Sequence, residues 1–162
     1  MILYFLRHGR AQEPRDGLAD DERRLTGAGI AQLRAAAPLR HRLNLRPDVV
    51  LASPLPRAMH TAALLAEALA LADEPIPDAR LSPGASWHDF AQSLARHVDA
   101  RRVLFVGHEP DLSTVVELLS GAAAVRLRPA GLACLEFPGV PEAGAGEIAW
   151  LLDPDLYALR DD

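Results

Sequence analysis

Short apolar runs, separated by polar segments that contain glycine and proline, recur along the 162-residue chain. Runs of this kind that are rich in Val, Leu, Ile and Phe are typical of strands buried inside a sheet. The first run, Ile2 to Leu6, passes directly into the polar residues Arg7 and His8. Strands are predicted at residues 2–6, 48–53, 102–108, 131–137 and 146–152.

Apolar residues at helical spacing lie between most of these runs. Thr26 is a suitable N-cap for the first helix, and Gly121 is expected just beyond the last one. Pro38 lies inside the first helical pattern and is expected to kink or divide that helix. Residues 10–25 and 73–84, which contain glycine or proline, are predicted to be loops. Helices are predicted at residues 26–43, 54–72, 86–98 and 110–121.

The alternation of strands and helices predicts an α/β fold, a three-layer α/β/α sandwich with helices on both faces of a mostly parallel sheet. No repeat and no long linker divides the chain, so residues 1–162 are predicted to form a single domain. The acidic C-terminal segment, about residues 154–162, is predicted to be a flexible tail.

The composition narrows the classes of function. A formal net charge of −5 disfavours nucleic acid as a partner. Every one of the 17 basic residues is an arginine, so a phosphate site in this chain must be built from arginine and histidine. The single cysteine, Cys134, excludes an intrachain disulfide. No apolar segment is long enough to span a membrane and no signal peptide is evident, so a cytoplasmic protein is expected.

Basic residues follow the ends of the predicted strands. The first strand ends in Arg7-His8-Gly9, the second in Ser53 with Arg57 shortly beyond it, and the third in Gly107-His108-Glu109. Ligands of open α/β sheets bind beyond the carboxyl ends of the strands. If these strands are parallel neighbours, two arginines and two histidines converge there. An anion would satisfy such a cluster, and arginine forks match the oxygens of phosphate.

The motifs resemble those of a known family. "LRHGRA" at the N-terminus, "LTGAG" at 25–29, "ASPLPRAMHTA" at 52–62 and "VGHEPDLS" at 106–113 are similar, in this order, to motifs of the histidine phosphatase superfamily, which includes the cofactor-dependent phosphoglycerate mutases. The short length and "LSPGAS" at 81–86 are most similar to its small SixA-type branch, the phosphohistidine phosphatases. The resemblance implies a phosphoglycerate mutase-like fold.

The resemblance also implies roles for individual residues. His8 corresponds to the nucleophile that becomes phosphorylated, and Arg7, Arg57 and His108 correspond to the rest of the phosphate pocket. Physical chemistry agrees, because Arg7 beside His8 should disfavour the imidazolium and keep a nitrogen lone pair available. The carbonyl of Gly9 is expected to hold the other ring nitrogen, and Gly9 itself to allow a close approach and an unusual backbone angle. No cofactor is expected, and no metal, since the six histidines form no convincing ligand cluster.

Further residues are candidates for the pocket. Arg23 or Arg24 flanks the pocket mouth or is simply solvated. His60 lies one helical turn from Arg57, and either faces the pocket or lies on the helix surface. Ser53 is interpreted as a cap or a pocket-wall hydroxyl, because no Ser-His-Asp order is evident.

The proton donor is the least defined part of the predicted site. Glu109, which directly follows His108, and Glu13, in the loop after the first motif, are candidates. Asp78 and Asp89 are further candidates, but the region around them has no matching motif. An alkoxide leaving group needs a donor, whereas imidazole leaves more readily because its conjugate acid has a pKa of about 6.5. A site without a dedicated acid should therefore favour phosphoramidates. No long insertion separates Arg57 from His108, so a shallow pocket that admits a phosphorylated protein side chain is expected.

The leading hypothesis from the sequence is a metal-independent phosphohistidine phosphatase that acts on a phosphorylated protein through phospho-His8. A phosphatase or mutase of small phosphorylated substrates is the enzymatic alternative. A phosphate-binding regulatory domain without turnover is the alternative from another class, and the presence of all four basic residues argues against it. Neither a nucleic acid nor a membrane is expected as a partner.

Overall fold

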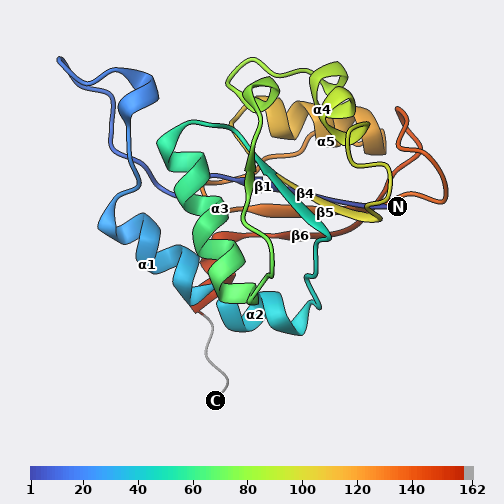
Figure 1. The fold of residues 1–162 in the computed structure, drawn as a ribbon, viewed down its shortest axis with the longest axis horizontal. Coiled ribbons are helices and arrows are strands. Elements are labelled where there is room, and N and C mark those ends of the chain that lie inside the picture. Colours follow the sequence, from blue (N-terminus) through green and yellow to red (C-terminus); the bar gives the residue numbers. More distant parts are fainter. Residues whose placement is uncertain (159–162) are drawn as a thin grey trace.

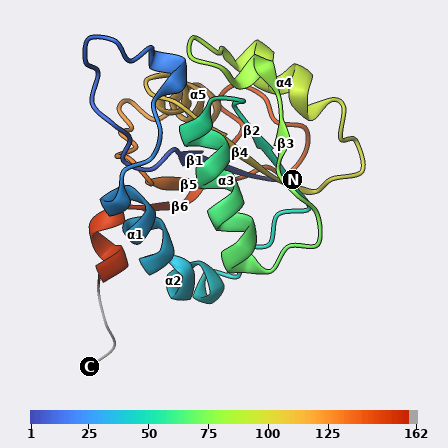
Figure 2. The ribbon, with the colours of Figure 1, turned by 60° about the vertical axis from the view of Figure 1, so that its left-hand side comes forward.

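Six strands form one sheet in the computed structural model, which describes residues 1–158. The order across the sheet is β3-β2-β4-β1-β5-β6, and Figures 1 and 2 together label all six strands. The four strands β3, β2, β4 and β1 are parallel, and β5 and β6 are antiparallel to their neighbours. The predicted mostly parallel sheet is therefore confirmed. The strands are β1 Ile2–Arg7, β2 Val49–Ala52, β3 Ile76–Pro77, β4 Arg102–Gly107, β5 Leu132–Glu136 and β6 Glu147–Leu152.

Every predicted strand is present, and β3 is an addition. Residues 73–84 were expected to be a loop throughout, but Ile76 and Pro77 pair with β2 at the edge of the sheet. Prolines at positions 75 and 77 hide this strand from any apolar pattern. Proline is tolerated there because an edge strand has one side without a ladder.

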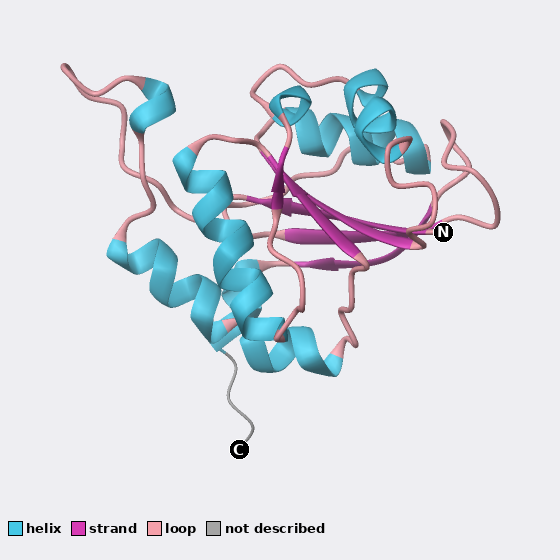
Figure 3. Ribbon diagram, in the orientation of Figure 1, coloured by secondary structure: helices cyan, strands magenta, loops and turns pink. Residues whose placement is uncertain are grey.

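Helices cover both faces of the sheet, as Figures 1 and 3 show. Helices α1, α2 and α3 pack on one face, and α4 and α5 pack on the other. Alternate residues of β1 serve the two cores: Tyr4 and Leu6 face α1–α3, whereas Leu3 and Phe5 face α4 and α5. This is the predicted three-layer sandwich. The helices are α1 Gly27–Ala35, α2 Ala37–Arg42, α3 Pro56–Leu69, α4 Trp87–Leu94 and α5 Asp111–Ser120.

The helix ends follow the local sequence. Thr26 caps α1, because its hydroxyl accepts from the amide of Gly29 at 3.0 Å. The first helical pattern is divided at Ala36, just before Pro38. Gly121 ends α5 in the left-handed conformation, with φ of 73°. Helix α3 is shorter than predicted, because Ala70 adopts a left-handed cap with φ of 49°.

The C-terminal segment is more ordered than the sequence predicted. Residues 154–158 form a 3-10 helix, η3 (Pro154–Ala158), that packs against α1. Tyr157 is buried in the core on this face, and its hydroxyl donates to the carbonyl of Ala130. The prediction of a flexible tail is wrong for these residues because a buried aromatic ring anchors them. The rest of the predicted tail, 159–162, lies outside the described residues.

The loop predicted at residues 10–25 also contains local structure. It holds a short 3-10 helix, η1 (Asp20–Glu22), and the isolated bridge between Ala11 and Leu25. Figure 2 shows this loop (blue) near the N-terminal end of α3. A similar turn, η2 (Ala79–Leu81), follows β3. Within residues 1–158, no helix has the length and apolar character needed to cross a membrane.

Candidate active site

The carboxyl ends of β1, β4 and β2 meet at one edge of the sheet. Arg7 lies opposite Gly107, and the amides of His8 and Ser53 donate to the carbonyls of Gly107 and Val106. The rings of His8 and His108 are consequently 5.2 Å apart, tilted by 58°. Arg57 enters from the first turn of α3, directly after β2. Arg7, His8, Arg57 and His108, predicted from separate motifs, are brought together.

The tautomer of His8 is set by its neighbour. Its Nδ1 lies 2.7 Å from the carbonyl oxygen of Gly9. A carbonyl only accepts, so Nδ1 carries the proton and the lone pair of the neutral ring is on Nε2. Burial lowers the pKa of His8 to about 4, and the positive charges of Arg57, Arg7 and Arg23 contribute to that shift. His8 is therefore neutral near pH 7, with Nε2 available as a nucleophile.

His108 is fixed by Ser53. The distance between Nε2 of His108 and Oγ of Ser53 is 2.8 Å, and both residues are buried. Burial lowers the pKa of His108 to about 3, with further lowering from His8 and Arg57. Ser53 also accepts from the amide of Leu55 at 3.4 Å. Of the two interpretations of Ser53 from the sequence, the hydroxyl has the contact of a turn cap, and it also holds the ring of His108.

Both arginines are anchored by protein oxygens, and the Nε donor of each remains unused. Nη1 of Arg7 donates to the carbonyl of Leu127 at 2.9 Å, and the terminal nitrogens of Arg57 donate to Asp20. Among the described residues, the buried Nε atoms of Arg7 and Arg57 and the buried Nδ1 of His108 have no hydrogen-bond partner. A buried polar group without a partner costs about 1–3 kcal/mol. Three such nitrogens around His8 suit an anion with several oxygens.

Gly9 packs closely against the core, as predicted, but without the expected unusual backbone angle. A Cβ on Gly9 would lie 2.8 Å from Cδ1 of Leu33. Gly9 is not among the glycines with positive φ, so it does not adopt the left-handed backbone that favours glycine, and that part of the prediction is wrong. Its amide donates to Oγ1 of Thr61 at 3.0 Å, and Thr61 donates to the carbonyl of Arg57 at 2.7 Å.

Thr61 was not singled out in the sequence. It lies four residues after Arg57 in α3, on the same face of the helix, and this spacing was the available signal. His60, the predicted neighbour, is exposed, whereas Thr61 is buried. One helical turn beyond Arg57, the buried side chain is therefore that of Thr61.

The glycine-rich start of α1 docks on the chain just beyond Gly9. The amide of Thr26 donates to the carbonyl of Arg10 at 2.9 Å. A Cβ on Gly29 would lie 2.3 Å from that same carbonyl oxygen, and one on Gly27 would contact nothing within 4 Å. The second glycine of "LTGAG" is therefore required by this backbone contact.

A cavity of about 460 Å³ opens beside the cluster. Arg23 lines it, donates from Nε to the carbonyl of Gln12, and forms an ion pair of 2.7 Å with Asp20. Arg24 is exposed and pairs with Gln12 through its backbone: its amide donates to Oε1 of Gln12, and its carbonyl accepts from the amide of Gln12 at 2.9 Å. Of the two predicted arginines, Arg23 is thus the one at the pocket mouth. The lining residues are Arg7, His8, Gly9, Arg10, Ala11, Glu13, Arg23, Thr26, Ala28 and Pro129.

The candidate proton donors differ in their surroundings. Glu13 lines the cavity and is exposed. Burial raises the pKa of Glu109, whose Oε1 has no hydrogen-bond partner among the described residues. Asp78 accepts from the amide of Arg80 and from Ser93, and Asp89 forms the capping box of α4. The structure therefore gives Asp78 and Asp89 local structural roles.

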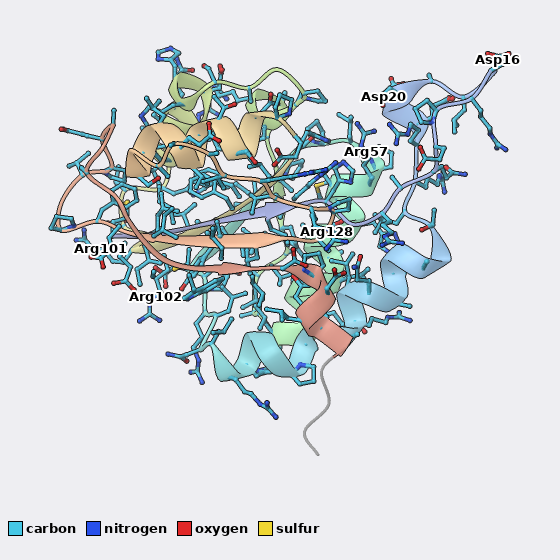
Figure 4. The ribbon with its side chains drawn as sticks, turned by 180° about the vertical axis from the view of Figure 1, so that it is seen from behind. Asp16, Asp20, Arg57, Arg101, Arg102 and Arg128 are labelled. Carbon is cyan, nitrogen blue, oxygen red and sulfur yellow. The ribbon has the colours of Figure 1, made fainter. Side chains whose placement is uncertain are left out.

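A larger hollow of about 860 Å³ lies between Pro47–Val50 and Arg96–Ala100. These residues adjoin the amino ends of β2 and β4, the opposite end of the sheet from His8. In Figure 4, Arg101 and Arg102 mark that end and Arg57 marks the other. The smaller cavity is thus the one that adjoins the chemistry. In residues 1–158, no group of three or more histidine, cysteine or acidic side chains is arranged to hold a metal ion.

Comparisons with known proteins give consistent results. The model of the histidine phosphatase superfamily (branch 1) matches residues 3–82. An uncharacterized protein of Picosynechococcus sp. is 34% identical over 165 residues, which cover 98% of this chain and 95% of that protein. A SixA protein histidine phosphatase, solved with tungstate, has a similar fold, with a TM-score of 0.83 at 23% identity over 96% of this chain and 98% of that one. A proposed SixA phosphohistidine phosphatase from Nakamurella multipartitia has a TM-score of 0.72 at 25% identity, over 94% and 95%.

Proposed function

Because the chain belongs to the histidine phosphatase superfamily, a family of phosphatases, we propose that it hydrolyses phosphohistidine on a protein through a phospho-His8 intermediate. The observation that carries this proposal is the lone pair of His8, on Nε2, together with three buried nitrogens without partners on Arg7, Arg57 and His108. The fold shared with SixA proteins supports the choice of substrate.

In the first step, Nε2 of His8 attacks the phosphorus atom and the N–P bond of the substrate breaks. The phosphoryl oxygens receive hydrogen bonds from Arg7, Arg57 and His108, which stabilise the charge that they carry in the transition state. Nδ1 keeps its proton on the carbonyl of Gly9 throughout. The resulting phospho-His8 ring is positively charged, which makes it a good leaving group for the second step.

The leaving group decides which substrates suit this site. Phosphohistidine whose distal ring nitrogen is protonated releases neutral imidazole, so the protein need not supply a proton. A water molecule then attacks the phosphorus of phospho-His8, the Nε2–P bond breaks, and both water protons leave with the dihydrogen phosphate. Neutral His8 is restored with its proton still on Nδ1. No group in the site other than His8 changes its covalent state.

Hydrolysis of small phosphomonoesters is the second candidate. It is favoured by Glu13 at the cavity and by Glu109, whose raised pKa keeps its carboxyl protonated to a higher pH. Either carboxyl would have to deliver a proton to the departing alkoxide, because an alkoxide is a poor leaving group.

Turnover of three substrates by the full chain separates these candidates. A phosphohistidine-bearing protein, p-nitrophenyl phosphate and an alkyl phosphate monoester are compared at equal enzyme concentration and neutral pH. The proposal predicts the highest kcat/KM for phosphohistidine and the lowest for the alkyl ester. Much faster turnover of the alkyl ester would replace phosphohistidine by the second candidate.

A further inference from the structure

Asp20 contacts two arginines of the site at once. Its Oδ2 accepts from Nη2 of Arg57 at 2.8 Å, and its main-chain carbonyl accepts from Nη1 of the same guanidinium. Its Oδ1 accepts from Nη1 of Arg23 at 2.7 Å. Figure 4 shows Asp20 on the loop that lies beyond Arg57. The sequence drew attention to both arginines and not to the acid that joins them.

The two contacts on Arg57 occupy one particular side of the guanidinium. An arginine offers an end-on fork, formed by Nη1 and Nη2, and a side-on fork, formed by Nε and Nη2. Asp20 fills the end-on fork with its two oxygens. Nε, which belongs to the side-on fork, is buried and has no partner in the described part of the chain. Asp20 therefore leaves free the fork that a phosphoryl group needs.

The exposure of the two side chains indicates whether Asp20 supports Arg57 or competes with the substrate for it. The side chain of Arg57 is 4% exposed, whereas that of Asp20 is 60% exposed. Asp20 thus approaches the guanidinium from the solvent side, and the unused Nε lies on the buried side. An anion held by Nε and Nη2 can bind without displacing the carboxylate.

The loop itself is shaped to present Asp20. Arg23 donates from Nε to the carbonyl of Gln12 and from Nη1 to Asp20. The side chain of Gln12 accepts from the amide of Arg24 at 2.9 Å. These bonds tie the two strands of the loop together and hold η1 over the start of α3.

We propose that Asp20 is a positioning residue of the phosphatase: it holds the end-on fork of Arg57 so that the side-on fork faces the transferred phosphoryl group. This inference rests on the proposed function, since it assigns Arg57 to the phosphoryl oxygens. Arg23 assists this positioning, because it donates to Oδ1, the second oxygen of the Asp20 carboxylate. An orienting contact of this kind acts mainly on the transition state, where the geometry of the donors matters most.

The test compares Asp20→Ala, Asp20→Asn and Asp20→Glu with Asp21→Asn, which changes the exposed neighbouring acid of η1. Asp20→Ala is expected to lower kcat about 10-fold and to change KM less than about 3-fold. The kcat of Asp20→Asn should lie between those of Asp20→Ala and the wild type, because its single amide oxygen cannot accept from both Arg57 and Arg23. Asp20→Glu should recover part of the loss, and Asp21→Asn should match the wild type.

Two further measurements make the role specific. Lysine has no fork to orient. When Asp20→Ala is added to Arg57→Lys, kcat should therefore fall less than about 2-fold below that of Arg57→Lys alone. By calorimetry, Asp20→Ala should weaken binding of orthovanadate, which resembles the transition state, about 10-fold, and binding of inorganic phosphate less than about 3-fold. The calorimetric comparison needs no turnover, so it tests Asp20 even if phosphohistidine is not a substrate.

Opposite results would overturn the inference. Tighter binding of phosphate together with a raised kcat/KM in Asp20→Ala would make Asp20 a competitor of the substrate. If Asp20→Ala lowers kcat as much in the Arg57→Lys background as in the wild type, or weakens vanadate and phosphate binding equally, Asp20 supports the loop as a whole and does not orient Arg57. If Asp20→Ala does not fold, Asp20→Asn supplies the same comparisons.

Discussion

Ser53 and His108 share a buried hydrogen bond of 2.8 Å between Oγ and Nε2, which joins the ends of β2 and β4. The bond leaves Nδ1 as the ring nitrogen of His108 that can meet a phosphoryl oxygen. Two residues from separate motifs thus depend on one another, because the hydroxyl decides how the imidazole is presented.

Removal of that hydroxyl should affect both activity and stability. Ser53→Ala is expected to lower kcat about 10-fold, since the ring of His108 loses its orientation. It should also cost about 1–3 kcal/mol of stability, because Nε2 of His108 remains buried without a partner. Steady-state kinetics and urea unfolding measure the two effects. Ser82→Ala, at the end of η2, is the matched control, and an unchanged kcat in Ser53→Ala would contradict the assigned contact.

Replacement of the nucleophile should nearly abolish turnover. His8→Ala is expected to lower kcat by about 10³-fold or more, because no other lone pair is available at this position. His41→Ala, an exposed histidine in α2, should leave activity unchanged. Substantial activity in His8→Ala would overturn the proposed mechanism.

The covalent intermediate gives a second readout on His8. Brief incubation with a labelled phosphohistidine protein should place label on the wild-type chain, and that label should be lost in acid and chased by unlabelled substrate. His8→Ala should acquire none. Label that persists in acid would point to a serine or threonine ester instead.

The lowered pKa values of the two histidines should make stability depend on pH. The unfolded chain takes up protons below a pKa of about 6.5, whereas folded His8 does so only near 4 and folded His108 near 3. Stability is therefore full above about pH 6.5 and falls as the pH decreases toward 4. For His8 alone the loss is on the order of 3 kcal/mol.

Urea unfolding of the wild type and His8→Asn between pH 8 and pH 4 measures this effect. The two proteins should show parallel pH dependence above pH 7. Below pH 6 the variant should lose less stability, because it lacks the imidazole of His8, whose pKa is lowered in the folded protein. An identical slope in both proteins would mean that burial does not perturb His8.

The two glycines of "LTGAG" should respond differently to alanine. Gly29→Ala places a Cβ against the carbonyl of Arg10 and is expected to destabilise the fold by about 1–3 kcal/mol. Gly27→Ala meets no atom within 4 Å and should be neutral or stabilising by up to about 1 kcal/mol. Thermal unfolding of the two variants provides the comparison, and similar melting temperatures would contradict the close contact.

The sequence predicted the parts of the site that are local to strand ends. Arg7, His8 and His108 directly follow or end buried apolar runs, and the parallel register then places them together without further information. Arg57 was found in the same way, because α3 begins immediately after β2. The three-layer fold also followed, since every strand except β3 is an apolar run and the helices between the strands have apolar residues at helical spacing.

The parts that were missed depend on contacts between distant segments. Asp20 resembles any other exposed acid of the loop until the loop folds over α3. The sequence analysis named His60 and not Thr61 as a candidate for the pocket, although helical spacing also places Thr61 on the same face of α3 as Arg57. Tyr157 appeared to belong to an acidic tail, because nothing nearby in the sequence shows the core into which its ring fits.

The position of β1 has a consequence for how the site is built during synthesis. This strand ends in Arg7, with His8 directly after it, and Ile2 pairs with Arg102 on one side and with Glu136 on the other. His8 is therefore synthesised before the residues of either neighbouring strand. A chain that has not been synthesised beyond residue 136 has His8 but lacks a complete neighbour for β1, so the pocket around His8 can be completed only after that residue has been made.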